Sequence, residues 1–191
     1  MGKSASGKDT FYRELMRTES LELRKLILYT TRPMRDGEEN GREYFFVAGE
    51  QLEAFRKQGR IIEEREYQTI YGPWFYFTAD DGQIHWEGND YLGIGTLESF
   101  CALKAYYGED KICPVYIEVE DGERLMRALQ REKEQVHPHY AEMCRRFLAD
   151  EEDFSEDKLR NAGIRVRFEN RDMEKCLEEI IGYIQQYRSQ R

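Results

Sequence analysis

The chain has 191 residues, of which 40% are hydrophobic and 35% are charged, and its formal net charge is −9. This length allows one full-sized globular domain, and the composition carries no signature of disorder. The negative charge argues against a nucleic-acid-binding protein, which normally presents a basic field, and no apolar run approaches the roughly 18 residues that a membrane span needs.

Strands and helices alternate in the first half of the chain. The apolar, β-branched run at 26–30 predicts a buried strand, and Gly59 marks the end of a short helix. Bulky residues alternate over 60–67 and 74–78, which is typical of a small antiparallel sheet. The predicted elements are a helix at 8–17, strands at 26–30 and 43–47, a helix at 51–57, and strands at 60–67 and 74–78.

The second half continues the alternation and then becomes mainly helical. The closing helix carries apolar residues on one face, as a helix packed on a core does. The predicted elements are strands at 90–94 and 112–119 around a helix at 97–107, helices at 122–134 and 140–151, a strand at 164–168 and a helix at 172–187. Together they predict an α/β fold with a mostly parallel sheet, and with a small mixed sheet inserted into it.

The segment GKSASGKDT at residues 2–10 is the most informative short motif. Its glycines let backbone N–H groups converge on a phosphate at the positive end of the next helix, and Lys8 would reach the transferred phosphate. The alternative is a flexible, Gly/Ser-rich N-terminus. Asp9 stands where a Ser or Thr usually contacts Mg²⁺, so we expect Mg²⁺ with ATP but assign no direct metal ligand. The candidate ATP-binding residues of this loop are Gly2, Ser4, Ser6, Gly7, Lys8, Asp9 and Thr10.

A loop of this kind normally follows a buried strand, but the sequence has only Met1 before Gly2. We therefore expect one further short strand ahead of Gly2. Without that strand, the sheet would contain a gap and unpaired backbone groups.

The segment YTTRPMRDGEENGREYFFV at residues 29–47 carries two arginines three positions apart. Arg32 and Arg35 on an irregular segment can both grip one phosphate dianion, and Tyr44 adds a hydroxyl donor. The alternative is that both arginines are surface ion-pair partners of the many acidic residues.

This segment resembles the guanylate kinase family, whose pattern is TTR-x-x-R-x-GE-x-x-G-x-x-Y-x-F. The matching residues are Thr30, Thr31, Arg32, Arg35, Gly37, Glu38, Gly41, Tyr44 and Phe46. The resemblance implies a P-loop kinase fold and phosphoryl transfer from ATP to a nucleoside monophosphate, with GMP as the first choice. It also implies that Arg32, Arg35 and Tyr44 hold the acceptor phosphate and that Arg32 takes part in catalysis.

The family organisation implies one domain over 1–191. Its parts would be a core (1–31, 90–122 and 162–191), an acceptor-binding insert (32–89) and a helical lid (123–161). The segments around Ile61-Ile62-Glu63 and Tyr71-Gly72 extend the resemblance. They imply that Glu63 accepts hydrogen bonds from the guanine edge, with Glu64 or Glu66 in its place if the register slips, and that Tyr71 reaches the phosphate.

Two positions depart from the family pattern. Pro73 stands where the family carries Ser or Thr, and Gly95 stands where it carries Asp. Both positions belong to the base-binding and metal-positioning parts, so a related acceptor stays open, and Thr96 or Glu98 could compensate.

The C-terminal third resembles the lid and adenine side of the family. Residues 125–131 and 144–147 contain three candidate catalytic arginines, Arg131, Arg145 and Arg146. Arginines on a mobile helical hairpin can close over the β- and γ-phosphates, although a solvated charged helix face explains each of them as well. Asn170 is a candidate for adenine contact, and it could also cap the last helix.

Four scattered cysteines without a CxxC pair predict thiols in a reducing compartment, and no signal peptide is visible, so we expect a cytoplasmic protein. The expected partners are ATP and a nucleoside monophosphate, with neither nucleic acid nor membrane. A non-catalytic, guanylate-kinase-like binding module is the rival hypothesis, and a nucleotide-sensing P-loop regulator is a third. The presence of Lys8 favours the enzyme.

Overall fold

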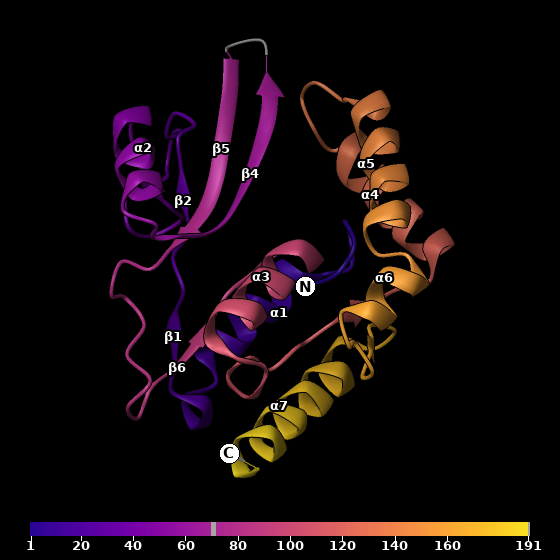
Figure 1. Ribbon diagram of the computed structural model, residues 1–191. Helices are drawn as coiled ribbons and strands as arrows, with labels where there is room; N and C mark the ends of the chain where they lie inside the picture. Colours follow the sequence, from indigo (N-terminus) through magenta and orange to yellow (C-terminus); the bar gives the residue numbers. More distant parts are fainter. Residues whose placement is uncertain (70–71, 191) are drawn as a thin grey trace.

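The computed structural model describes residues 1–69 and 72–190, which form a core, an inserted sheet and a helical arm (Figure 1). The core contains two pairs of parallel strands, as expected for an α/β protein. Its elements are α1 (Lys8–Arg17), β1 (Leu23–Lys25), β6 (Asp90–Leu92), α3 (Leu97–Tyr107), β7 (Ile117–Glu118), β8 (Phe168–Glu169) and α7 (Met173–Ser189), with short 3-10 turns at Glu19–Leu21 and Glu109–Lys111.

Two apolar clusters hold the core together. Phe11 and Leu15 of α1 pack with Ile180 and Ile184 of α7 and with Ile117 of β7. A second cluster joins α3 to the chain around β7 and to the end of the helical arm, through Leu97, Phe100, Tyr116, Phe154, Leu159, Ala162 and Ile164. The strands of the core are therefore enclosed between helices, which is the usual setting of parallel strands.

The inserted sheet has the strand order β3-β2-β5-β4, with β2 parallel to β3 and antiparallel to β5. Tyr29 of β2 stacks on Phe77 of β5, with ring centroids 5.0 Å apart, and Phe45 and Phe55 pack around the pair. Helix α2 covers this aromatic face, which leaves the opposite face of the sheet available. The elements are β2 (Tyr29–Thr30), β3 (Phe45–Phe46), α2 (Gly49–Lys57), β4 (Ile61–Thr69) and β5 (Gly72–Ala79).

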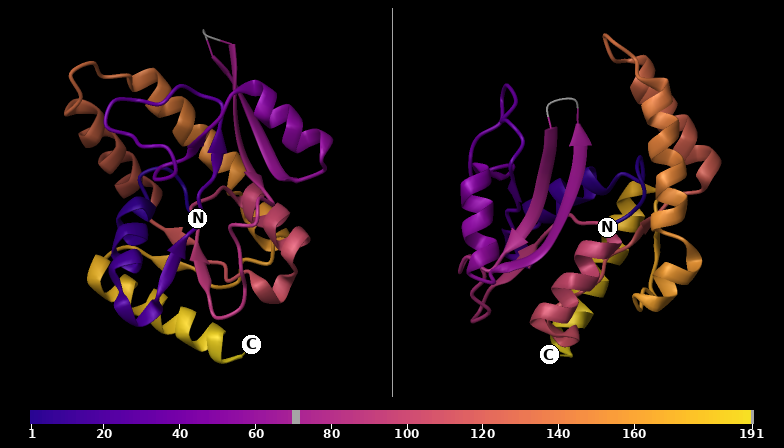
Figure 2. Two further views of the ribbon diagram at one scale, coloured as in Figure 1. Left: turned by 90° about the vertical axis from the view of Figure 1, so that its left-hand side faces the viewer. Right: turned by 45° about the horizontal axis from the view of Figure 1, so that its top comes forward.

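The helical arm consists of α4 (Asp121–Lys133), α5 (Tyr140–Asp153) and the short helix α6 (Glu156–Asn161). The inserted sheet and the arm stand on opposite sides of the N-terminal loop (Figures 1 and 2). Within the part of the chain that the structure describes, no helix is long and apolar enough to cross a membrane.

The strand predicted at 26–30 is wrong in its extent, because only Tyr29 and Thr30 belong to a strand. The chain crosses here from the core to the inserted sheet. The Gln83 side chain forms hydrogen bonds with both backbone groups of Ile27. Its Oε1 accepts from the Ile27 N–H at 2.9 Å, and its Nε2 donates to the Ile27 carbonyl at 3.1 Å. A side-chain amide thus replaces a neighbouring strand at the crossing.

The strands predicted at 112–119 and 164–168 are also shorter than expected. They pair only at Ile117↔Phe168 and Glu118↔Glu169. Pro114 has no N–H to donate. Among the described residues, the other side of β7 bonds only to the backbone of Met1. The helices predicted at 8–17 and 97–107 are confirmed, and so are the two antiparallel strands of the insert.

All four cysteines are thiols, as predicted. Cys101 on α3 and Cys144 on α5 are exposed, Cys113 is half-buried, and Cys176 on α7 is buried. Burial raises the pKa of the Cys176 thiol to about 11.

Candidate functional site

The glycine-rich loop at residues 2–7 folds closely against β7 and the turn after β8. A Cβ atom at Gly2 would lie 2.6 Å from the Ile117 carbonyl oxygen, and one at Gly7 would lie 2.7 Å from Nδ2 of Asn170. Gly7 also has a φ of 89°, which favours glycine. Its carbonyl accepts the first hydrogen bonds of α1. The loop thus leads directly into the positive end of a helix, an arrangement suited to phosphate.

The side chains of this loop are placed differently from one another. Lys8 begins α1 and is half-buried, whereas Asp9 is exposed. Ser6 is buried, and its hydroxyl oxygen has no hydrogen-bond partner among the described residues. Thr10 Oγ1 accepts from Arg13 at 3.4 Å. The described residues include no group of three or more His, Cys, Asp or Glu that could hold a metal ion.

Asn170 ties the loop to the rest of the core. It is buried, and its Nδ2 donates to the Ser6 carbonyl at 2.9 Å. Its own carbonyl accepts from Arg127 of α4 at 3.1 Å. The cap of α7 is not Asn170 but Asp172, whose Oδ1 accepts from the N–H groups of residues 174 and 175. The capping role considered for Asn170 is therefore wrong, because its side chain is committed to the loop.

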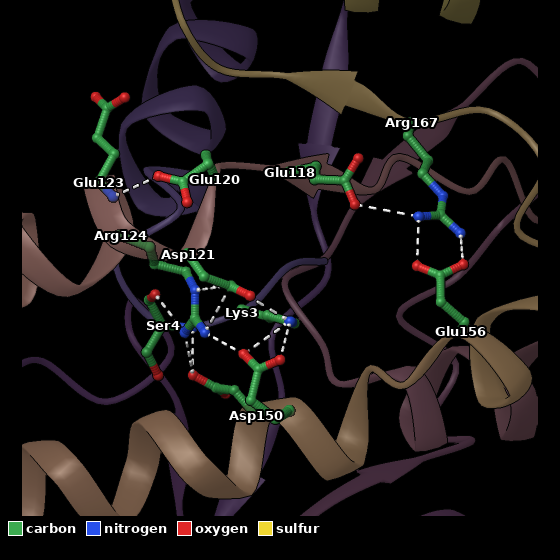
Figure 3. Close-up of polar contacts among 11 residues, drawn as sticks. Lys3, Ser4, Glu118, Glu120, Asp121, Glu123, Arg124, Asp150, Glu156 and Arg167 are labelled. Atoms are coloured by element: carbon green, nitrogen blue, oxygen red, sulfur yellow. Dashed lines mark hydrogen bonds and ion pairs between the residues drawn. The ribbon is translucent and has the colours of Figure 1, made fainter.

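An ionic cluster that no sequence motif predicted joins the loop to the arm (Figure 3). The backbone N–H of Ser4 donates to Asp150 Oδ2 at 2.8 Å, and Lys3 Nζ donates to both oxygens of Glu151 at 2.8 Å. Both carboxylates belong to α5. The arm is thus held directly against the glycine-rich loop.

Arg124 of α4 lies at the centre of this ionic cluster and is only 1% exposed. Its guanidinium contacts Asp121 at 3.1 Å, Asp150 at 3.3 Å and also Glu151. It stacks on the Phe147 ring, with Cζ 4.1 Å from the centroid. A buried arginine of this kind depends on its carboxylate partners, since an unpaired charge in the interior is costly.

The Arg32 side chain is fixed in the inserted sheet and is 4% exposed. It forms a two-pronged contact with Glu38, with its Nη1 and Nη2 atoms 2.7 and 2.6 Å from the carboxylate oxygens. Its guanidinium lies over the rings of Tyr44 and Phe46, 5.3 and 5.2 Å from their centroids. The structure therefore brings the Arg32 guanidinium into contact with the Tyr44 ring.

Glu38 organises the same turn, because one of its oxygens also accepts from the backbone N–H of Arg35 at 2.7 Å. The hydrogen bonds from Arg32 and from this N–H lower the pKa of Glu38 to about 2. The side chain of Arg35 itself is exposed. The turn thus presents an ordered arginine beside an exposed one.

We predict that Glu38→Gln lowers stability in a pH-dependent way. The depressed pKa of Glu38 contributes stability that is present above its ordinary pKa of 4.5 and is lost as the pH falls towards about 2. The free energy of unfolding, measured by urea titration, should therefore differ between wild type and variant near neutral pH, and the difference should shrink below about pH 4.5. A difference that stays constant down to pH 2 would contradict this assignment.

Glu63 lies on β4, 7% exposed, and both of its oxygens are engaged. Oε1 accepts from Thr78 at 2.9 Å across the strand pair, and Oε2 accepts from Arg65 at 3.1 Å. Glu64 instead pairs with Arg56 of α2 on the other face of the sheet. The register therefore assigns Glu63 to the face that α2 leaves uncovered.

Tyr44 belongs to the same uncovered face, because its ring packs on Tyr76, with centroids 5.6 Å apart. Tyr76 in turn packs on Tyr67. Tyr71, which was predicted to reach the acceptor phosphate, lies outside the described residues. Arg32, Tyr44 and Glu63 thus share one surface of the inserted sheet.

A cavity of about 740 Å³ opens between the inserted sheet, the start of α3 and the arm. Thr96 and Glu98 line it, and Thr96 caps α3 by accepting from the Ser99 N–H at 3.2 Å. The other lining residues are Glu64, Arg65, Glu66, Tyr67, Leu97, Cys101, Asp153, Lys158, Asn161 and Ala162. This volume is in the range of ordinary small-molecule sites.

The three predicted lid arginines lie on the exposed surface of the arm. Arg145 donates two hydrogen bonds of 2.7 Å to Glu142, one turn away on the same helix, and Arg146 lies 3.8 Å from that carboxylate. Arg127 was not among the predicted residues, although it is the arm arginine that contacts Asn170. Arg127 precedes Arg131 by four residues, which puts both on one face of a helix, and this spacing was the sequence signal that could have identified it.

Comparisons with known proteins agree with this geometry. A family model described as guanylate kinase matches residues 1–80. A guanylate kinase of Porphyromonas gingivalis is 27% identical over 96% of this chain and 93% of its own length. A guanylate kinase of Streptococcus agalactiae is 39% identical over 70 residues, which cover 37% of this chain and 34% of that protein.

A solved structure gives the same picture at the level of the fold. The crystal structure of a guanylate kinase from Anaplasma phagocytophilum matches with a TM-score of 0.65 at 17% sequence identity. The match covers 97% of this chain and 82% of the other. The predicted P-loop kinase fold is therefore confirmed.

Proposed function

We propose that this chain, which is similar to guanylate kinases in sequence and in fold, transfers the γ-phosphoryl group of ATP to GMP. The observation that carries the proposal is the pairing of two phosphate-binding arrangements in one chain. One is the glycine-rich loop at residues 2–7, which leads into Lys8 and α1. The other is the fixed Arg32 beside Tyr44 on the inserted sheet.

On the donor side, the loop N–H groups and Lys8 would hold the phosphates of ATP, together with the other loop residues named above. Mg²⁺ would arrive with ATP as part of the substrate, since Asp9 is exposed and Thr10 is engaged by Arg13. Asn170 fixes the loop from behind. Its predicted contact with adenine is part of the same proposal.

On the acceptor side, Arg32, Arg35 and Tyr44 would hold the phosphate of GMP, with Tyr71 as a further donor. One of the phosphate oxygens attacks the γ-phosphorus, and the bond from that phosphorus to the bridging oxygen breaks. The bridging oxygen leaves with the electron pair as part of ADP, so the products are ADP and GDP. Alignment and charge neutralisation supply the rate enhancement, without a covalent intermediate.

The arm would act as a lid over the transferred group. Arg131, Arg145 and Arg146 are exposed on it, so their proposed catalytic role requires the arm to move when both nucleotides are bound. We also propose the partition into core, insert and lid given above, and a cytoplasmic location.

The proposal is tested by measuring ADP production from ATP·Mg²⁺ with GMP, dGMP, AMP, UMP and CMP as separate acceptors. Turnover with GMP and dGMP alone is the expected result. Turnover with a different base would assign another acceptor, in line with the departures at Pro73 and Gly95. Binding of a monophosphate without any turnover would overturn the proposed activity.

We predict that Glu63→Gln lowers kcat/KM for GMP by about 10- to 100-fold, because a hydrogen bond to a buried charged acceptor is worth roughly 1.5–3 kcal/mol. The amide offers the guanine edge one acceptor and an unwanted donor. The matched control is Glu64→Gln, whose carboxylate pairs with Arg56 on the opposite face. Equal effects of the two substitutions would contradict the placement of the base at Glu63.

A further inference from the structure

Arg65 lies two residues after Glu63 on β4, on the face of the inserted sheet that α2 leaves uncovered. Successive side chains of a strand alternate between the two faces, so Arg65 and Glu63 share this face. In the register of the sheet, Arg65 lies opposite Tyr76 of β5, whose ring packs on Tyr44. Arg65 therefore belongs to the surface that is proposed to hold the acceptor.

Protein groups use only part of the Arg65 guanidinium. The side chain is 16% exposed, and its Nε donates to Glu63 Oε2 at 3.1 Å. Within the described part of the chain, the two Nη groups of Arg65, which carry four of the five N–H donors of a guanidinium, have no hydrogen-bond partner. Arg65 also lines the cavity of about 740 Å³. A largely buried guanidinium with unused donors beside a cavity needs water or a ligand to complete its hydrogen bonds.

The Glu63 carboxylate is held by protein groups but keeps room for a ligand. Its Oε1 accepts from Thr78, and its Oε2 accepts from Arg65. Each carboxylate oxygen has two lone pairs, so Glu63 keeps acceptor positions while its orientation is fixed. The Nη atoms of Arg65 are bonded to the same carbon as Nε, so their N–H groups lie beside these acceptor positions. The pair thus presents acceptors and donors next to one another.

The acceptor phosphate is the competing partner of the Arg65 donors. The pKa of Tyr44 is raised by burial and then by Tyr76, and the charges of Arg32 and Arg65 oppose this rise. The charge of Arg65 is therefore felt on the phosphate side of the surface as well. However, a phosphate dianion at the Nη groups would lie beside the negative charge of Glu63, which is unfavourable. A neutral acceptor group suits the position better.

We propose that Arg65 is a specificity-determining residue that donates to O6 of guanine, while Glu63 accepts from N1–H and the 2-amino group. On the guanine ring, O6 stands next to N1–H, so the donor and acceptor pattern matches that of the Arg65–Glu63 pair. Adenine carries an amino donor at the position of O6, and Arg65 would face it donor to donor, which disfavours AMP. The inference rests on the proposed transfer to GMP and adds the residue that recognises the 6-oxo group.

The test compares GMP with 6-thioguanosine monophosphate, which keeps N1–H and the 2-amino group but carries sulfur, a weaker acceptor, in place of O6. Wild type should prefer GMP by about 10-fold in kcat/KM. Arg65→Met should lower kcat/KM for GMP by about 10- to 100-fold and reduce the preference to about two-fold or less. Arg56→Met is the matched control, because Arg56 pairs with Glu64 of β4 on the opposite face. It should leave both values within about two-fold of wild type.

Two further variants separate recognition of O6 from folding and from the orientation of Glu63. Glu63→Gln alone should keep the preference for GMP over the thio analogue. The double variant Glu63→Gln/Arg65→Met leaves no unpaired buried charge, which protects the fold, and it should lose the preference. An unchanged preference in both variants that lack Arg65 would overturn the inference, because Arg65 would then only orient Glu63 or bind the phosphate. So would a wild-type protein without any preference.

Equilibrium binding of both nucleotides, measured by isothermal titration calorimetry, gives the same preference as a ratio of Kd values. Wild-type protein that binds GMP with this preference but does not turn it over would contradict the proposed activity and leave the role of Arg65 standing. Turnover of GMP without dependence of the preference on Arg65 would do the reverse. Wild-type protein that does not bind GMP would overturn both.

Discussion

Replacing Lys8 by alanine is expected to lower kcat/KM for phosphoryl transfer by at least about 100-fold, the scale found when one preorganised donor to a developing charge is removed. Lys8 is the first residue of α1, directly after the loop closed by Gly7. Its ammonium would neutralise charge on the transferred phosphoryl group, and no neighbouring lysine of the loop can replace it, because Lys3 is bound to Glu151. Steady-state kinetics with saturating GMP measures the loss.

Lys175→Ala is the matched control for Lys8→Ala. Lys175 is exposed on α7 and pairs weakly with Asp172, at 3.8 Å, so its removal should leave kcat/KM within about two-fold. Thermal unfolding separates catalysis from folding, because Lys8→Ala should keep a wild-type-like Tm. A Lys8→Ala enzyme with wild-type turnover would contradict the assignment of this loop to ATP.

Replacing Arg124 by alanine is expected to destabilise the protein by about 3 kcal/mol or more, since it removes the buried partner of several carboxylates. Asp150 and Glu151 would remain beside the glycine-rich loop without their shared cation. The stacking on Phe147 would also be lost. The free energy of unfolding, from urea titration followed by circular dichroism, measures the effect.

Arg145→Ala provides the comparison on the same arm. Arg145 is exposed and pairs with Glu142 one turn away, an arrangement worth no more than about 1 kcal/mol. Arg124→Lys should fall between the two, because a lysine keeps the charge but loses the planar fork. If Arg124→Ala were as stable as Arg145→Ala, the ionic cluster would contribute no more to the free energy of unfolding than an exposed ion pair does.

The parts of the site that could be predicted from the sequence are those written in consecutive residues. Gly7 and Lys8 stand at the start of a helix that the sequence predicted at the same residues. Arg32 and Tyr44 lie within one short segment, and the structure brings them into contact. Strand alternation, once the register is known, puts Glu63 and Glu64 on opposite faces of the inserted sheet.

The ionic cluster could not be predicted in this way. Arg124 and Asp150 are 26 residues apart, and their contact depends on how α4 packs against α5. Nothing in the sequence near Arg124 distinguishes it from the exposed arginines of the same helix. The core strands are shorter than predicted for a related reason. An apolar run such as 112–119 predicts that residues are buried, but a strand forms only where a neighbouring strand pairs with its backbone.

Helix α6 is an element that the sequence did not predict at all. Its six residues are too few for a periodic pattern, and only Ser155 followed by two acidic residues signals its start. It was therefore not predicted, although Leu159 is buried in the core.

The distribution of the thiols makes the proposed closure of the arm open to optical measurement. Cys144 is exposed on α5 and Cys101 is exposed on α3, whereas Cys176 is buried with a raised pKa. One attachment point for a dye thus lies on the arm and one on the core, without any engineered cysteine at either place. Energy transfer between a donor and an acceptor dye at these two positions would report the swing of the arm in single molecules as each nucleotide binds.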